Sequence, residues 1–139
     1  MKKYLPFFTF LVLTTTLFSC KKAVENKQQD LITSAIVDGI WVVDQYLEGT
    51  NNISSDFLNY DFKFNADGTV SGTKASNATA GTWSSNISNY SITSNFPSAN
   101  DPLQKMNGVW IITDSYWDFV KAEMTTSGGK NILHLRKKP

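Results

Sequence analysis

The sequence predicts an all-β protein, a small up-and-down antiparallel β-barrel of about eight strands preceded by one short helix. From residue 40 onward, the chain is a series of short β-prone runs separated by Gly, Asn, Asp and Ser turn signals. The clearest run, residues 58–64, alternates strictly: Leu58 and Phe64 belong to its apolar face, and Lys63 to its polar face. Tight turns between neighbouring runs favour a meander that closes on itself. A two-sheet β-sandwich is the alternative architecture.

Residues 1–19 predict a signal peptide and not a part of the fold. Met1-Lys2-Lys3 is basic, and residues 5–18 form an apolar stretch too short and too close to the start for a good transmembrane helix. Cys20 follows and is the one cysteine of the chain, so an intrachain disulfide is impossible. Residues 20–27 predict a polar tether, which leaves residues 28–139 as one folded domain.

Residues 28–37 predict a short helix, because apolar side chains recur there at one-turn spacing before Asp38-Gly39 ends the pattern. We expect this helix to close one mouth of the barrel; a helix that lies on a membrane or binds a partner is the alternative. The next run, residues 40–47, predicts the first strand, with Trp41 on one face and Tyr46 on the other. A polar loop, residues 49–56, follows it.

The remaining strands are separated by recognisable turns. Asn65-Ala66-Asp67-Gly68 predicts a hairpin after residues 58–64, since Gly adopts positive φ without steric cost. A Pro-bearing loop begins at residue 96, and residues 101–107 predict one helical turn. The other predicted strands are residues 69–73, 79–84, 90–93, 108–113, 116–124 and 131–136.

The predicted folded body is acidic, although the whole chain has a formal net charge of +1. Residues 38–135 contain five lysines and ten acidic residues, a net charge of −5, while basic residues gather at the two ends. Nucleic-acid binding needs Lys and Arg clustered on a folded face, so this balance argues against a nucleic-acid partner. We interpret the basic ends as solvated tails, and a position near an anionic membrane surface is the alternative.

No catalytic or metal-binding pattern stands out in the sequence. His134 is the one histidine, and it falls in a predicted strand, where a lone His is more often structural than catalytic. A zinc site needs several converging His, Cys or carboxylate ligands, and an α/β-hydrolase serine needs a Gly-x-Ser-x-Gly turn; the sequence offers neither. We interpret Asp114 and Asp118 as a solvated rim and not as a paired catalytic acid and base. The prediction is a protein that is not an enzyme and that uses no metal or cofactor.

The aromatic side chains are the remaining candidates for a binding site. A cup lined by aromatic residues is typical of a small-molecule pocket, whereas a plain hydrophobic core is the alternative for each of them. Adjacent strand residues point to opposite faces, so either Tyr116 or Trp117 is expected to be exposed as a surface contact. The candidate pocket residues are Trp41, Tyr60, Phe62, Phe64, Trp83 and Trp110.

Leu17-Phe18-Ser19-Cys20 resembles the lipobox of bacterial lipoproteins. In that family the signal is cut before the Cys, which is diacylated and usually acylated on its new amine as well. The resemblance implies a lipidated Cys20 and attachment to a membrane of the bacterial cell envelope, since two or more acyl chains anchor stably where one does not. Residues 21–27 lack the acidic run that accompanies surface export in Bacteroidetes lipoproteins, so a periplasm-facing position on the outer membrane is slightly favoured over the cell surface.

The strand pattern carries a second resemblance, which covers roughly residues 39–137. Gly39-Ile40-Trp41 resembles the Gly-x-Trp that opens the first lipocalin strand, and Thr113-Asp114-Ser115-Tyr116 is similar to the Thr-Asp-x-x-Tyr turn between the sixth and seventh strands. Arg136 lies near the chain end, where lipocalins often pack a basic side chain against the first Trp. The hairpin at residues 64–69, followed by Gly-Thr-Trp-Ser, is similar to the small lipocalin-like lipoproteins of Bacteroidetes.

Two functions are expected from these observations. The first is a membrane-anchored lipocalin-like barrel that binds a small apolar or amphipathic ligand in the aromatic cup, with Trp41 sealing its closed end. The second is a protein interaction or inhibitor module with a filled barrel, which contacts an envelope protein through residues 49–56 and 96–107. The volume of the barrel interior discriminates between them: no cavity larger than about one water's share of volume favours the interaction module.

Overall fold

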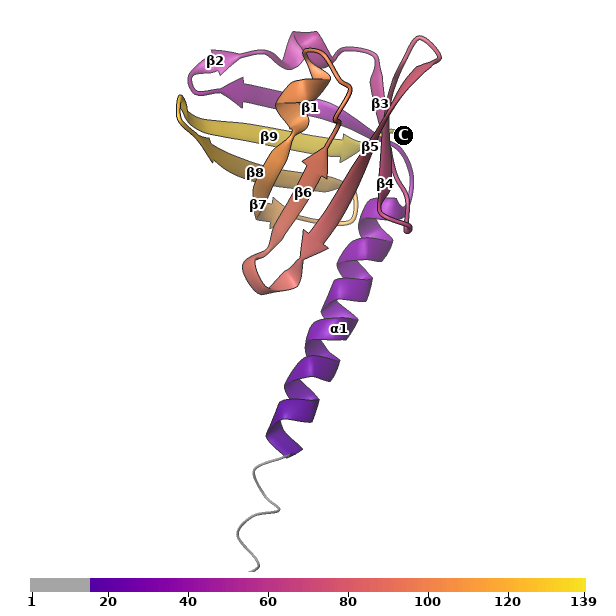
Figure 1. Cartoon of the computed structure of the whole chain (residues 1–139), viewed down its shortest axis with the longest axis vertical. Helices are drawn as coiled ribbons and strands as arrows, with labels where there is room; N and C mark the ends of the chain where they lie inside the picture. The colour runs from indigo at the N-terminus through magenta and orange to yellow at the C-terminus, as the bar shows by residue number, and fades with distance from the viewer. Residues whose placement is uncertain (1–15) are drawn as a thin grey trace, which may run out of the picture.

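The computed structural model describes residues 16–139, which form one α-helix, nine strands and three short 3₁₀ turns (Figure 1). The predicted signal peptide falls mostly on residues 1–15, which lie outside the described residues. The elements, in chain order, are α1 (Thr16–Val37), β1 (Trp41–Glu48), β2 (Asn51–Asn52), η1 (Ser54–Phe57), β3 (Tyr60–Phe64), β4 (Thr69–Lys74), β5 (Asn77–Asn86), η2 (Ile87–Asn89), β6 (Ser91–Asn95), η3 (Leu103–Met106), β7 (Gly108–Ser115), β8 (Phe119–Thr126) and β9 (Gly129–Lys137).

Eight strands close into an antiparallel barrel, as the sequence predicts. From β3 to β9 each strand pairs with the next, and β1 closes the ring by pairing with both β3 and β9. The two-residue β2 pairs only with the end of β1, where Leu47 lies opposite Asn52. The sheet therefore closes on itself, which excludes the alternative of a two-sheet sandwich.

A β-bulge in β1 changes which side chains point into the barrel. The register against β9 shifts between Val43 and Gln45, so Asp44 is the extra residue. Inward positions thereby change from odd to even numbers, and both Trp41 and Tyr46 are buried, at 1% and 0% exposure. The prediction that these two side chains lie on opposite faces is wrong, because it assumed an uninterrupted alternation.

The helix is longer than predicted and is continuous with the segment expected to be a tether. It runs from Thr16 to Val37 and ends at Asp38-Gly39, as expected, with Gly39 at φ +85°. Its C-terminal half packs on the barrel, where Ile36 is buried, Ile32 packs against the core and Gln29 donates to Ser85 of β5. Figure 1 shows the N-terminal turns of α1 extending away from the barrel, on the side opposite to β2.

The Asn65–Gly68 turn forms the predicted hairpin between β3 and β4. Gly68 has φ +85°, and the backbone N–H and hydroxyl of Thr69 donate to the carboxylate of Asp67 at 2.9 and 2.6 Å. These hydrogen bonds lower the pKa of Asp67. The turn is thus built from local interactions, which is why the sequence alone predicts it.

Two strands begin two or three residues later than predicted, at Tyr60 and at Phe119. Leu58 was expected on the apolar face of a strand, but β3 begins only at Tyr60, after Asn59 at φ 66°, and Leu58 is 63% exposed. Tyr116 was expected to begin a strand, but β8 begins at Phe119. Tyr116 and Trp117 belong to the β7–β8 connection, so the alternation argument does not apply, and both are exposed.

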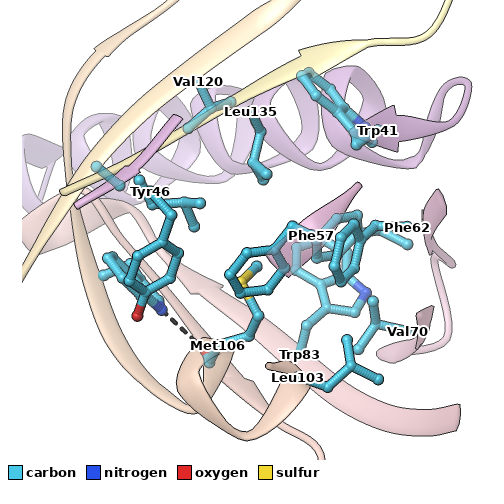
Figure 2. Packing of buried hydrophobic residues seen from close by; sticks show 14 of the residues in the cluster. Trp41, Tyr46, Phe57, Phe62, Val70, Trp83, Leu103, Met106, Val120 and Leu135 are labelled. Atoms are coloured by element: carbon cyan, nitrogen blue, oxygen red, sulfur yellow. Dashed lines mark hydrogen bonds between the residues drawn. The ribbon is translucent and has the colours of Figure 1, made fainter. Parts of the chain in front are cut away.

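One hydrophobic cluster fills the barrel, and Figure 2 shows side chains from β1, β3, β4, β5, η1 and η3 meeting in it. Gly81 allows a close contact within this cluster, between the backbone of β5 and the ring of Phe96. A Cβ at Gly81 would lie 2.6 Å from the carbonyl oxygen of Asn95 and 2.8 Å from the ring of Phe96. Phe96, which is 1% exposed, therefore packs directly against the backbone of β5. The packing brings the candidate pocket residues together, and their geometry decides whether a ligand has room.

Candidate functional site

Five of the six candidate pocket residues are buried, and the sixth, Tyr60, is half-buried. Only Phe62, Phe64 and Trp110 of this set line the internal cavity; Trp41, Tyr60 and Trp83 lie outside its lining. The complete lining is Phe62, Phe64, Ile92, Ser94, Phe96, Met106, Trp110, Val120, Ala122, Leu133 and Leu135. The predicted aromatic cup is therefore not a single pocket, because only half of its residues line this cavity.

The internal cavity has a volume of about 30 Å³. Pockets for small molecules are about ten times larger or more. Aromatic rings occupy the space instead: Phe62 meets Phe96 edge-on at 6.5 Å between ring centres and stacks on Tyr60 at 6.1 Å. In this structure the barrel is filled by its own side chains.

The polar atoms of the interior are also satisfied within the protein. Trp110 Nε1 donates to the carbonyl of Met106 at 2.9 Å, and Trp83 Nε1 donates to the carbonyl of Asn65 at 2.9 Å. Among the described residues, every buried side-chain nitrogen or oxygen has a hydrogen-bond partner. A ligand in the barrel would find no waiting donor or acceptor of the kind that fixes a bound molecule.

The predicted contact segments, residues 49–56 and 96–107, contain β2, most of η1 and all of η3, which Figure 1 shows at the end of the barrel away from α1. They contribute buried side chains to the core, including Ile53, Phe96 and Met106. Lys105 Nζ lies 2.8 Å from Glu48 Oε1 and joins one segment to β1; this hydrogen bond is the main cause that raises the pKa of Lys105. We call this end of the barrel the far end. Leu58, which follows η1, is an exposed apolar side chain next to these segments.

Trp41 lies at the opposite mouth, beneath the end of α1. Its Nε1 donates to the carbonyl of Ile36 at 2.8 Å, and Lys137 Nζ lies 5.5 Å from the centre of its ring. The lipocalin resemblance implied Arg136 in this position, but Arg136 points outward and pairs with Asp44 at 3.2 Å. The basic side chain over the first Trp is therefore Lys137, one residue further along β9.

An apolar groove lies between α1 and this mouth. Its deeper part has a volume of about 110 Å³ and is lined by Ile32, Ala35, Ile36, Trp41, Tyr90, Ile112, Ser115, Tyr116 and Val120. A shallower hollow of about 210 Å³, lined by Leu31, Ile32, Ile87 and Tyr90, adjoins it through the two shared residues. We call the two together the helix-end groove.

Tyr90 was predicted in a strand, so its exposed position at the surface was not expected. In the structure Tyr90 ends η2 with φ 51°, and its side chain is 55% exposed. The side chain of Asn86 accepts a hydrogen bond from the backbone of Ser88, an Asx turn that begins this irregular segment. Asn86 followed by Ser88 and Asn89 is the local signal that could have predicted a turn here.

The basic C-terminal end is not a set of solvated tails. Lys137 pairs with Asp38 at 3.0 Å and Lys138 with Asp61 at 2.8 Å, in addition to the pair formed by Arg136. Each positive charge thus has an acidic partner from α1's end, β1 or β3. The helix end carries no uncompensated basic patch from these three residues.

Within residues 16–139, no group of three or more His, Cys, Asp or Glu side chains could hold a metal ion. No helix in the same part of the chain is long and apolar enough to cross a membrane. His134 is half-buried in β9, opposite Gln45 of β1. Cys20 falls within α1, and its side chain lies outside the described part of the structure.

No protein-family model and no curated protein matches the chain. Among solved structures, the chain is similar to the crystal structure of a DUF4847 family protein from Bacteroides vulgatus. The two are 13% identical with a TM-score of 0.56, and the match covers 78% of this chain and 99% of the other. At this identity the likeness establishes a shared barrel fold, and it extends over almost the whole of the Bacteroides protein.

Proposed function

We propose that this chain is a lipid-anchored protein of the bacterial cell envelope that acts as an interaction module through its outer surface. It is not an enzyme, and it carries no ligand inside the barrel. The observation that carries the proposal is the internal cavity of about 30 Å³, which is about a tenth of the volume of a small-molecule pocket or less. A protein of this kind binds with the side chains it exposes at its ends and walls.

The anchor is supported by the lipobox-like Leu17-Phe18-Ser19-Cys20. Cleavage before Cys20 would leave residues 20–139 as the mature chain, held in a membrane by the acyl chains on Cys20. Because α1 leads from Cys20 to one mouth of the barrel, the far end would then point away from the membrane. A periplasm-facing position is slightly favoured, on the sequence grounds given above.

The far end is the surface we propose for a protein partner. Its segments are held by core residues and by the Lys105–Glu48 pair, so they form a rigid platform. Leu58 stands on this platform with 63% of its side chain exposed, an apolar centre among Asn, Ser and Asp residues. An exposed apolar side chain within a polar rim is the usual anatomy of a protein contact.

The test combines two readouts on the same protein. A photo-crosslinking amino acid placed at Leu58 in the native cell should give a discrete adduct with one envelope protein, whereas the same label at Thr82, on the exposed wall of β5, should not. Native mass spectrometry of residues 20–139, purified gently from a host with ordinary lipids, should give the mass of the empty protein. A reproducible small-molecule adduct that is lost on denaturation, and that is weakened by Trp110→Ala, would contradict the proposal.

A further inference from the structure

The exposed aromatic side chains of the described residues gather at the helix end of the barrel. They are Tyr90 at 55% exposure, Tyr116 at 74% and Trp117 at 52%. Tyr90 follows η2, and the other two lie between β7 and β8; Tyr90 and Tyr116 line the same groove beneath α1. Two connections that are distant in sequence thus present one aromatic rim around the mouth sealed by Trp41.

This aromatic rim is held in place by specific contacts. Lys137 Nζ lies 4.3 Å from the ring centre of Trp117 and also pairs with Asp38. The backbone N–H of Tyr116 donates to the carbonyl of Phe119 at 2.9 Å, and the carbonyl of Tyr90 accepts from Ile112 at 2.7 Å. Tyr90 also holds a positive φ, a conformation that costs free energy for a bulky residue and persists only when its surroundings impose it. The exposure of the rim is therefore built into the fold.

The basic side chains of the C-terminal end, next to the aromatic rim, add no net positive charge to it. Arg136, Lys137 and Lys138 are each paired with an aspartate, so they do not form a patch for anionic groups. Tyr and Trp carry an apolar ring with a polar edge, and for this reason they concentrate at the boundary between lipid tails and water. The adjoining groove is lined almost wholly by apolar side chains, which suits lipid tails and not a charged ligand.

The position of Cys20 determines which surface the aromatic rim can reach. Cys20 and Ile36 are both in α1, so sixteen residues of helix, on the order of 24 Å, separate the anchor from the buried Ile36. When α1 lies along the bilayer surface, an anchor at Cys20 therefore keeps the helix end at a high effective concentration beside the bilayer, where even a weak contact is occupied. The far end has no such constraint.

We infer that the aromatic rim of Tyr90, Tyr116 and Trp117 is a membrane-contacting face that enters the interfacial layer of a neutral bilayer and orients the barrel on it. This inference rests on the proposed lipid anchor. It adds to that proposal the orientation of the anchored protein, with the helix end on the membrane and the far end free for a protein partner.

The experiment imposes the anchor chemically, so that it does not depend on lipidation in cells. Residues 20–139 are coupled through Cys20, the one thiol of the chain, to a maleimide lipid in phosphatidylcholine vesicles. Lipids brominated near the headgroup then quench tryptophans that enter the interface. Trp41, Trp83 and Trp110 are at most 7% exposed, so Trp117 is the reporter.

We expect brominated lipid to lower the emission of the coupled wild-type protein and Trp117→Phe to lose this quenching. Tyr116→Ser should weaken the quenching, whereas Val109→Ser, at an exposed position on the wall of β7, should not. Circular dichroism confirms that each variant is folded. Absence of quenching in the coupled wild type, equal quenching in Trp117→Phe, or quenching only after anionic lipid is added would each overturn the inference. A chain that is not lipidated in cells but shows the expected quenching would refute the anchor and leave the membrane-contacting face standing.

Discussion

Tyr46 joins several parts of the far end through a single side chain. Its ring stacks on Phe57 at 5.2 Å between ring centres and meets Trp110 edge-on at 5.7 Å. Its hydroxyl donates to the carbonyl of Lys105 at 2.7 Å. No part of the residue is exposed, and burial is the main cause that raises the pKa of Tyr46 to about 12. The neutral hydroxyl is therefore part of the packing that closes the barrel.

The raised pKa predicts a loss of stability at high pH. The folded state disfavours ionised Tyr46, so its contribution is fully present below pH 10, the unfolded pKa, and is lost as pH rises towards 12. A difference of this size corresponds to roughly 2–3 kcal/mol. We expect urea unfolding at pH 8 and pH 11 to show a smaller pH-dependent loss for Tyr46→Phe than for wild type. An equal loss in both proteins would contradict the role of Tyr46.

At the scale of elements, the junction of α1 with the barrel depends on partners for the last carbonyls of the helix. Those carbonyls have no intrahelical donors and need partners from elsewhere. Trp41 Nε1 serves the carbonyl of Ile36, and Lys63 of β3 serves the next: its Nζ donates to the carbonyl of Val37 at 2.7 Å and to that of Gly39, just beyond the helix, at 3.1 Å. Lys63, on the polar outer face of β3, thus caps the C-terminal end of α1.

We predict that Lys63→Met lowers the free energy of unfolding by about 1–2 kcal/mol, because it removes two hydrogen bonds from a charged donor. Lys130→Met is the matched control, since Lys130 is a 57% exposed lysine that pairs with Glu123 on the barrel surface. Such exposed pairs contribute about 0–1 kcal/mol. Urea denaturation followed by tryptophan fluorescence measures both, and equal effects would argue against capping by Lys63.

At the scale of the whole molecule, the two ends of the barrel differ in what they expose. The helix end gathers exposed aromatic side chains around an apolar groove, and the far end is closed by two polar segments with Leu58 at the surface. The interior joins the two ends through one continuous core. If the proposed anchor holds the helix end at a membrane, the far end is left free to contact a protein.

The anchor itself can be tested in the intact chain. Cys20 is the one thiol, so we expect the wild-type protein to incorporate labelled palmitate in bacterial cells and Cys20→Ser to incorporate none. Ser19→Ala, which keeps a small residue before the Cys, should retain the label and controls for expression. Absence of label from the wild-type protein would contradict the lipobox assignment.

More of the fold than of the candidate site could be predicted from the sequence. The hairpin at Asp67-Gly68, the stop at Asp38-Gly39 and the eight barrel strands were predicted from local patterns, and the structure confirms them. Of the site, the burial of Trp41, Phe62 and Trp110 is consistent with both expected functions, so burial alone does not separate a pocket from a core. The helix-end groove was not predicted, because its residues come from α1, η2 and β7 and meet only in the folded chain.

By itself, the sequence determined the all-β class, the order of the elements and the position of the helix before the barrel, because periodicity and turn chemistry act between residues that are close along the chain. Only the tertiary structure decided that Asp44 forms a bulge and turns Tyr46 inward, that Lys137 and not Arg136 covers Trp41, and that the interior is filled. These features depend on the register between β1 and β9 and on how aromatic rings from distant strands pack within one core. A one-residue shift in register reverses the direction of every side chain that follows, and no local pattern in this sequence encodes it.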